Sequence, residues 1–312
     1  MRNDLLELFR NCRLCPRQCG VDRLAGEKGF CGLPARIRVA HYGPHFGEEP
    51  PVSGKKGSGN IFFASCNLRC IFCQNYQISR GEIGDPLTTN ELVEIFFSLE
   101  GKGCHNINLV SPTSYIPFVA EAIRRAREKG LSVPFVYNSN AYEEVEALAV
   151  LDGLIEIYLP DFKYWSDTIA CRLSGAPVDR GYSRHAKAAI LEMWRQVGSF
   201  TIHEGLAKKG LLLRHLVLPG NCAGSRHIMR WVRENLGPET FMSLMSQYSP
   251  LHKAHRYRMI NRRIRQEEYD ALIGCAVELG LENVFLQGLE SAPAYVPDFR
   301  KPEPFEGGAP VE

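Results

Sequence analysis

From residue 55 onward, short apolar runs alternate with segments whose apolar positions recur with the period of a helix. The apolar runs span residues 60–64, 106–110, 133–137, 155–159, 211–218, 241–245 and 284–286. The helix-period segments span residues 90–100, 117–129, 142–150, 184–197, 225–236 and 266–279. Alternation of this kind predicts parallel strands joined by helical crossovers. Six such units predict an α/β fold, an open and partial (β/α)6 barrel of the TIM type.

Residues at the ends of several helix-period segments have the chemistry of helix caps. Thr89 and Ser225 are predicted N-caps, because a hydroxyl there can accept a hydrogen bond from a free backbone N–H. Gly130 and Gly280 are predicted to end their helices, since glycine tolerates the left-handed conformation that often follows the last turn.

The chain before this alternating pattern reads as a separate segment, residues 1–54, rich in turn-forming residues. It contains four cysteines with the spacing Cys12-x2-Cys15-x3-Cys19-x11-Cys31. Such a segment has too few apolar residues to form a core of its own, so we expect a bound metal to keep it folded. Four thiolates suit zinc and an auxiliary 4Fe-4S cluster alike, and the third reading is that the cysteines are reduced and unligated.

The other predicted divisions are residues 55–290, the barrel, and residues 291–312. The latter are rich in Pro, Gly and Glu and are predicted to form a strap across the surface followed by disorder.

Composition restricts the partners and the compartment. The 312 residues are 45% hydrophobic, enough for a sizeable core, and Lys+Arg 37 against Asp+Glu 35 gives a formal net charge of +2. No overall field therefore favours nucleic acid or an anionic membrane. Eleven cysteines without an apolar leader favour a reducing compartment. The apolar runs are too short to span a bilayer, so we expect a cytoplasmic protein.

A cysteine triplet directly follows the first apolar run of the barrel pattern. Cys66, Cys70 and Cys73 are separated by three and by two residues. This spacing can place three thiolates on one face of a small loop, where they hold three irons of a cubane cluster and leave the fourth iron without a protein ligand. The alternative is a structural zinc site that lacks its fourth ligand.

With the aromatic Phe72 just before its third cysteine, the stretch resembles the signature of the radical S-adenosylmethionine (radical SAM) enzymes. Within that superfamily, roughly residues 55–290 resemble the glycyl-radical activating enzymes of the pyruvate formate-lyase activating enzyme type, in a subgroup with an extra amino-terminal four-cysteine motif. The resemblance implies a partial barrel, a 4Fe-4S cluster and S-adenosylmethionine (SAM). It also implies an electron donor of the flavodoxin or ferredoxin type, and reductive cleavage of SAM to a 5′-deoxyadenosyl radical that abstracts a hydrogen atom from a glycine of a protein partner.

The resemblance also implies which residues bind the cofactor. Ser111 and Thr113 stand where radical SAM proteins usually have a Gly-Gly-Glu-type segment, and Asn138 lies in a segment similar to the family's Asp-Thr-Asn-Gly. Asp161 and Lys163 match an Asp-x-Lys segment and alternate to the same side of an extended chain. The full predicted set is Phe72, Ser111, Thr113, Asn138, Asp161, Lys163, His215 and Tyr248.

Structural readings compete with some of these assignments. The Ser111 segment can be a capped helix start, and Asp161 with Lys163 a simple ion pair. Arg214 and His215 point to opposite faces of a strand, so only one enters the barrel; we expect His215, although a buried core histidine is the rival reading.

Two other functions stay open on the sequence. One is a radical SAM enzyme that modifies a small molecule or another protein. The other is a non-catalytic module that binds zinc through the first four cysteines and nucleic acid through the basic run at residues 252–265. The near-neutral total charge and the acidic Glu267 and Glu268 argue against nucleic acid, and favour a solvated face or a docking surface for a protein substrate.

Overall fold

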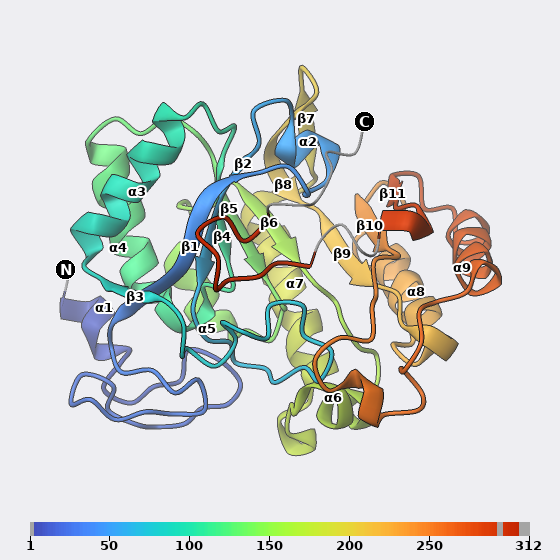
Figure 1. The fold of residues 1–312 in the computed structure, drawn as a ribbon. Helices are drawn as coiled ribbons and strands as arrows, with labels where there is room; N and C mark the ends of the chain where they lie inside the picture. Colours follow the sequence, from blue (N-terminus) through green and yellow to red (C-terminus); the bar gives the residue numbers. More distant parts are fainter. Residues whose placement is uncertain (1–2, 292–295, 306–312) are drawn as a thin grey trace.

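The computed structural model describes residues 3–291 and 296–305, and its centre is a curved layer of parallel strands with helices on the outside (Figure 1). Four adjacent parallel strands begin the barrel: β2 (Ser58–Phe63), β4 (Ile107–Val110), β5 (Phe135–Ser139) and β6 (Ile157–Pro160). Three more continue it: β9 (Leu213–Leu216), β10 (Met242–Met245) and β11 (Val284–Leu286). A parallel bridge between Asp161 and Arg214 joins the two groups. The predicted α/β partial barrel is confirmed.

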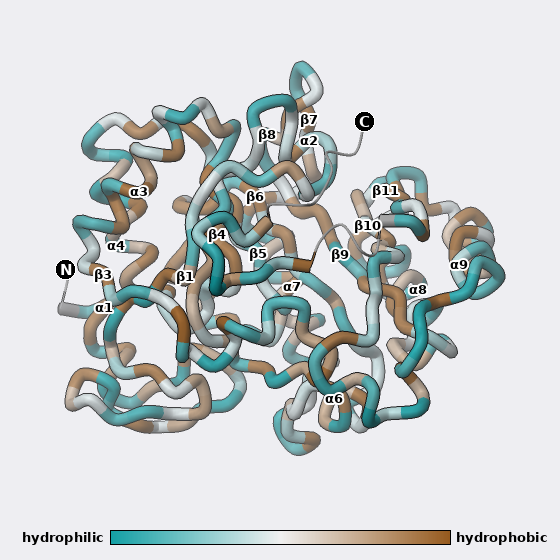
Figure 2. The backbone as a smooth tube through the Cα atoms, in the orientation of Figure 1, coloured by the Kyte–Doolittle hydropathy of each residue, from teal (hydrophilic) through white to brown (hydrophobic). Residues whose placement is uncertain are grey.

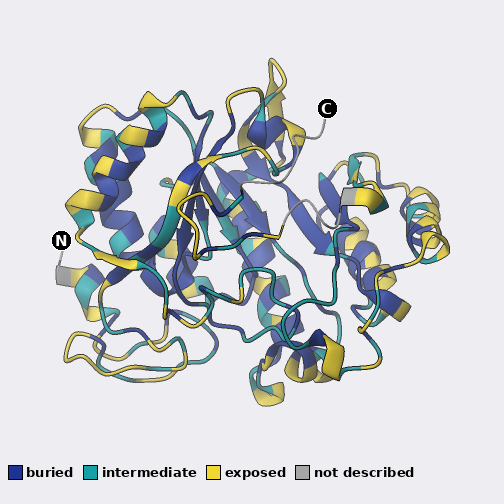
Figure 3. Cartoon of the chain, viewed as in Figure 1, coloured by how far each residue is buried: buried dark blue, intermediate teal, exposed yellow. Residues whose placement is uncertain are grey.

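Helices cover the outer face of the strands, and the residues between the two layers are buried (Figure 3). The crossover helices are α3 (Thr89–Gly101), α4 (Ile116–Glu128), α5 (Val145–Leu148), α6 (Asp167–Ser174), α7 (Tyr182–Val197), α8 (Ser225–Asn235) and α9 (Gln266–Glu278). Figure 2 shows the hydrophobic positions gathered on the strands and on the helix faces that cover them. None of the described helices is long and apolar enough to cross a membrane.

Antiparallel strands and short helices extend this framework. The strand β1 (Ile37–His45) pairs with β2 and with β3 (Asp85–Leu87), so residues 37–45 belong to the main sheet. The sequence analysis did not anticipate β1. Along the chain, the short helix α1 (Asn3–Glu7) precedes β1 and the short helix α2 (Pro50–Ser53) follows it. Single-turn helices occur at Thr113–Tyr115, Ala149–Leu151, Val178–Arg180, Pro219–Asn221, Ala254–Arg256 and Leu289–Ser291.

The single strand predicted at residues 211–218 is in fact two. The strand β8 (Leu206–Leu211) forms a hairpin with β7 (Thr201–His203), and β9 begins after it. Gly210 has a φ of +111°, and a Cβ there would lie 2.2 Å from the Ser199 carbonyl oxygen. Only glycine fits this close approach of two backbones, so the chain turns here from the hairpin toward the barrel.

Four of the six predicted helix segments agree with the structure to within one residue at each end, but the segment at residues 142–150 contains only the short α5, α7 begins two residues before its prediction, and α6 was not predicted. Thr88, rather than Thr89, is the N-cap of α3: its Oγ1 accepts a hydrogen bond from the Glu91 amide at 3.2 Å, while the Glu91 carboxylate accepts one from the Thr88 amide at 2.7 Å. Gly224, rather than Ser225, is the N-cap of α8. The glycines predicted to end α4 and α9 both follow those helices with positive φ, as expected for glycine after a last turn.

Residues 296–305 of the predicted strap cross the strands β1 and β2 (Figure 1). Phe305 packs on Phe62 and His45, with ring centroids 5.3 and 4.5 Å apart. Asp298 accepts a hydrogen bond from Gln77 at 2.8 Å, which ties this stretch to the loop after β2. The rest of the predicted strap and tail, residues 292–295 and 306–312, lies outside the described residues.

Candidate functional site

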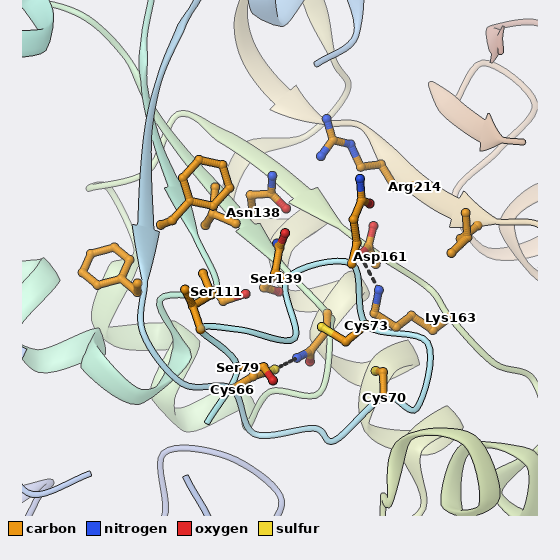
Figure 4. Close-up of a pocket in the computed structure, with 18 of the residues that line it drawn as sticks. Cys66, Cys70, Cys73, Ser79, Ser111, Asn138, Ser139, Asp161, Lys163 and Arg214 are labelled. Atoms are coloured by element: carbon orange, nitrogen blue, oxygen red, sulfur yellow. Dashed lines mark hydrogen bonds and ion pairs between the residues drawn. The ribbon is translucent and has the colours of Figure 1, made fainter. Parts of the chain in front are cut away.

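A cavity of about 250 Å³ lies at the carboxyl ends of the parallel strands, inside the barrel (Figure 4). This is the edge of the sheet at which α/β barrels place their chemistry. The sulfur-bearing side chains of Cys66, Cys70 and Cys73 line it, all from the loop that follows β2. Asp161 and Lys163 line the wall beside Cys70 and Cys73, and Arg214 lies at the far end from the cysteines.

Local hydrogen bonds fix the loop that carries the three cysteines. The Asn67 side chain donates to the Tyr142 carbonyl at 2.6 Å and so anchors the loop to the segment after β5. The Arg69 guanidinium donates to the Cys66 carbonyl at 2.7 Å and to the Ser79 carbonyl at 3.0 Å, which closes the loop on itself. The backbone is therefore held before any ligand binds.

Two of the cysteine sulfurs accept hydrogen bonds from other parts of the barrel. Asn140 Nδ2 lies 3.3 Å from Cys66 Sγ, and Ser174 Oγ donates to Cys70 Sγ at 2.9 Å. Burial raises the pKa of Cys70 and of Cys73, so the free thiols stay protonated until a metal displaces their protons. Thiols with donors aimed at their sulfurs suit a metal-sulfur centre, because such bonds stabilise negative charge on sulfur.

As placed, no three His, Cys, Asp or Glu side chains among residues 3–291 and 296–305 are grouped closely enough to hold one metal ion. A four-iron cluster binds each thiolate through a different iron. The donor set, three thiols on one loop facing one cavity, fits such a cluster.

Asp161 and Lys163 form an ion pair across one wall of the cavity, with Nζ and Oδ2 2.6 Å apart (Figure 4). Both follow β6 in extended chain, which turns them to the same side as predicted. Burial disfavours the charged lysine, but the Asp161 carboxylate more than offsets this and raises the pKa of Lys163. The pair thus supplies a lasting cation and a carboxylate at the cavity wall.

Ser111 and Asn138 also line the cavity, from the ends of β4 and β5. Ser111 has a φ of +59°, an uncommon conformation for a residue other than glycine, and its amide donates to the Asn138 carbonyl at 2.9 Å. Thr113 does not line the cavity: its hydroxyl donates to the buried Glu143 at 2.7 Å. Burial raises the pKa of Glu143 to about 7.

The side chain that enters the cavity from β9 is Arg214 and not, as expected, His215. His215 is fully buried on the other face of the strand, where Nδ1 donates to the Phe162 carbonyl at 2.6 Å and Nε2 accepts from Ser225 Oγ at 2.8 Å. Burial lowers the pKa of His215 to about 4, so the ring is neutral. His215 is thus a buried core histidine with both ring nitrogens hydrogen-bonded, as in the alternative interpretation.

Arg214 forms a buried cluster with two glutamates that the sequence analysis missed. Its guanidinium donates to the Glu49 carboxylate at 3.0 Å through Nε, and Nη2 bonds both Glu48 and Glu49. Asn60 and Asn108 donate to Glu48 at 2.6 and 2.9 Å, and Glu48 itself lines the cavity. The far end of the cavity is therefore closed by two carboxylates on one guanidinium.

Phe72 lines the cavity and Tyr248 lies behind it. Their rings meet edge to face with centroids 5.5 Å apart. The Tyr248 hydroxyl donates to the Ile260 carbonyl at 2.6 Å, so its polar end is already satisfied away from the cavity. Of the predicted cofactor residues, the structure thus brings together Phe72, Ser111, Asn138, Asp161 and Lys163, and leaves Thr113, His215 and Tyr248 outside the cavity lining.

The four amino-terminal cysteines line a second, much smaller cavity of about 20 Å³. Arg23 is buried beside it, with Nη1 4.0 Å from Cys12 Sγ, and its other bonds go to the carbonyls of Leu33, Pro34 and Ser114. No carboxylate pairs with this guanidinium among the described residues. A buried cation with only neutral partners suits a site whose thiolates carry negative charge.

Comparison with known proteins gives one family and several related folds. The family described as the Radical SAM superfamily matches residues 60–205. The chain is 29% identical over 292 residues to the uncharacterized protein MJ0674 of Methanocaldococcus jannaschii, covering 89% of this chain and 78% of that one.

Among solved structures, SuiB of Streptococcus suis bound to the precursor peptide SuiA is similar with a TM-score of 0.50 and 14% identity, over 75% of this chain and 49% of that one. HydG, a maturase of the FeFe-hydrogenase, has a TM-score of 0.50 and 14% identity, over 71% of this chain and 49% of that one. The chain thus spans about half the length of these two proteins, and the likeness shows a shared fold.

The matched residues include the loop of Cys66, Cys70 and Cys73 and the strands β2, β4, β5 and β6 that carry the cavity wall. Sequence match, fold and site therefore agree. Residues 60–205, which include the cysteine loop and four of the parallel strands, match the Radical SAM superfamily.

Proposed function

We propose that this chain binds a 4Fe-4S cluster through Cys66, Cys70 and Cys73, and that it cleaves SAM reductively to abstract a hydrogen atom from a substrate. The observation that carries the proposal is that three thiols of one loop face a single cavity, beside the partly buried ion pair of Asp161 and Lys163. Bound there, the cluster and SAM supply one-electron cleavage of the sulfonium and hydrogen-atom abstraction.

The chain's own residues hold, orient and shield these groups. Asn140 and Ser174 donate hydrogen bonds to sulfur and so favour the thiolate forms. Lys163 and Asp161 offer a cation and a carboxylate to the polar groups of SAM. Phe72 covers part of the cavity with an apolar face, which limits the access of water to the reacting atoms.

The test is 5′-deoxyadenosine formation by anaerobically reconstituted protein with SAM and dithionite. We expect product from the wild type and none from Cys70→Ala. Cys171→Ala is the matched control, because Cys171 is an exposed cysteine on α6 that does not line the cavity. Product from Cys70→Ala at the wild-type rate would contradict the proposed cluster site.

We also propose that Cys12, Cys15, Cys19 and Cys31 bind a second metal centre, which is either an auxiliary 4Fe-4S cluster or one zinc toward which the four thiols draw together from their present spacing. The common cavity and the buried Arg23 support this. A metal count of reconstituted protein separates the two: about four irons with one zinc, or about eight irons. The same count on Cys12→Ser with Cys15→Ser should lose only the second centre.

For the substrate, we propose a glycine of a glycyl-radical protein, on the resemblance of the segments at residues 137–141 and 159–164 to those of activating enzymes. Incubation with a candidate glycyl-radical enzyme and SAM should produce the doublet of a glycyl radical in electron paramagnetic resonance (EPR). If SAM is cleaved without such a signal, the chain modifies a small molecule or another protein.

A further inference from the structure

The segment at residues 252–265, here called the basic segment, packs directly on the loop that carries the three cysteines. The Lys253 amide donates to the Ile71 carbonyl at 2.7 Å, and Ile71 lies between Cys70 and Cys73. The His252 ring stacks on Tyr76, with centroids 4.9 Å apart and planes inclined by 13°. The basic segment therefore forms the outer surface next to the proposed cluster.

The basic segment presents cations that nothing within the chain neutralises. Arg256, Arg258 and Arg263 are exposed, and none has a carboxylate within ion-pair distance in the part of the chain that the structure describes. Arg262 differs, since it pairs with Glu268 at 2.7 Å. Because a solvated surface usually mixes the two signs of charge, a run of unpaired arginines suggests an anionic partner.

The cysteine loop adds to the same positive surface. Arg80, which follows that loop, is exposed. Burial lowers the pKa of His252, and the charged groups that act on it, Lys253, Arg80, Arg256 and His255, are all basic and lower it further. The positive charge is thus contributed by two segments that meet at the loop.

Resting on the proposed function, we propose that the basic segment is the docking surface for an acidic one-electron redox protein of the ferredoxin or flavodoxin class. Charge complementarity selects an acidic partner. Position selects a redox partner, because this surface lies one backbone hydrogen bond from the residues between Cys70 and Cys73.

Cleavage of each SAM molecule requires one electron. The reduced donor loses one electron, and the centre at Cys66, Cys70 and Cys73 gains it; no atom is transferred between the proteins. A protein electron donor must approach closely for this step, and the basic segment is a charged outer face adjoining that loop.

The test measures the dissociation constant between the anaerobically reconstituted enzyme and a purified acidic 2Fe-2S ferredoxin, by isothermal titration calorimetry at low and at physiological salt. The variant carries Arg256→Glu, Arg258→Glu and Arg263→Glu, all exposed and without an ion-pair partner among the described residues. We expect the dissociation constant to rise at least about tenfold and to lose most of its salt dependence.

The matched control carries Lys129→Glu, Lys208→Glu and Lys209→Glu, which change the net charge equally. All three are exposed, Lys129 after α4 and the other two on β8. These lysines lie toward the amino ends of the parallel strands. The cysteine loop follows the carboxyl end of β2 and is therefore at the other end of the barrel. We expect its dissociation constant to stay within about twofold of the wild type.

A second readout separates this inference from the proposed function. With dithionite in place of ferredoxin, the basic-segment variant should form 5′-deoxyadenosine at the wild-type rate, because a small reductant needs no docking. If the wild type forms no 5′-deoxyadenosine with dithionite, the proposed function is wrong. The ferredoxin-binding measurements still test the docking surface in that case.

Two results would overturn the docking proposal. The first is an equal loss of ferredoxin affinity in both triple variants, which would mean that total charge and not this surface matters. The second is tighter binding of a single-stranded RNA 20-mer than of ferredoxin at the same salt, lost in the basic-segment variant. That outcome would make the basic segment a nucleic-acid contact.

Discussion

Removing the guanidinium of the buried charge cluster should destabilise the protein strongly. In Arg214→Leu, the carboxylates of Glu48 and Glu49 keep their buried positions, with side chains only 8% and 7% exposed, and lose the cation between them. Breaking a buried ion pair by deleting one partner costs about 3–5 kcal/mol. With a shift of about 2–4 °C per kcal/mol for a chain of this size, Tm should fall on the order of 10 °C.

The pH dependence of the same variant gives a sharper signature. In the wild type, burial disfavours the charged Glu48, but Arg214 outweighs it, and the pKa of Glu48 falls to about 2. Glu48 therefore contributes about 3 kcal/mol at any pH above its unfolded pKa, and this contribution is lost as the pH falls from about 4.5 toward 2. Without Arg214, burial is opposed only by His45 and the hydrogen bond from Asn60, so the pKa of Glu48 rises. The stability of the variant should then rise relative to that of the wild type as the pH is lowered from 8 to 6, since Glu143, with a pKa of about 7, adds the same gain to both proteins.

The assay is urea unfolding at pH 8 and pH 6, followed by circular dichroism. Arg195→Leu is the matched control, because Arg195 also contacts two carboxylates, those of Asp152 and Glu192, but is 57% exposed. Exposed pairs contribute little, so this control should unfold close to the wild type at both pH values. Equal losses in the two variants, or no gain at pH 6 in the stability of Arg214→Leu relative to the wild type, would refute the account of the buried cluster.

Two further predictions concern the cluster environment and the backbone. Ser174→Ala removes the 2.9 Å hydrogen bond to Cys70 Sγ, so the reduction potential of the cluster should fall by roughly 40 mV, which is about 1 kcal/mol for one electron. An EPR-monitored redox titration measures this potential. An unchanged potential would mean that this bond does not tune the cluster. Gly210→Ala should cost at least about 2 kcal/mol in urea unfolding, because its Cβ would lie 2.2 Å from a backbone oxygen at positive φ. Gly274→Ala, inside α9 with open space around it, should instead stabilise by roughly 0.5–1 kcal/mol, and the same sign for both glycines would contradict the reasoning.

The sequence predicted those parts of the site that depend on the ends of parallel strands. Ser111, Asp161 and Lys163 follow β4 and β6, Asn138 lies near the end of β5, and parallel strands place their carboxyl ends at one edge. Spacing also identified the three cysteines, because a loop of eight residues keeps them together whatever the rest of the chain does.

The sequence could not predict contacts made across the barrel. Glu48 lies 166 residues from Arg214, and nothing local indicates that they meet. Alternation shows that Arg214 and His215 face opposite ways, but it does not say which one faces inward. That choice is made by the buried partners Phe162 and Ser225, which together satisfy both nitrogens of His215.

The most direct test of the central claim uses EPR on a variant in which Cys12, Cys15, Cys19 and Cys31 are all alanine, so that only the cavity cysteines can hold iron. After anaerobic reconstitution and reduction, we predict about four irons per chain and a cluster signal that changes when SAM is added, because one iron lacks a protein ligand. A protein that binds no iron, or a cluster signal that SAM leaves unchanged, would contradict the assignment of Cys66, Cys70 and Cys73 as a SAM-binding centre.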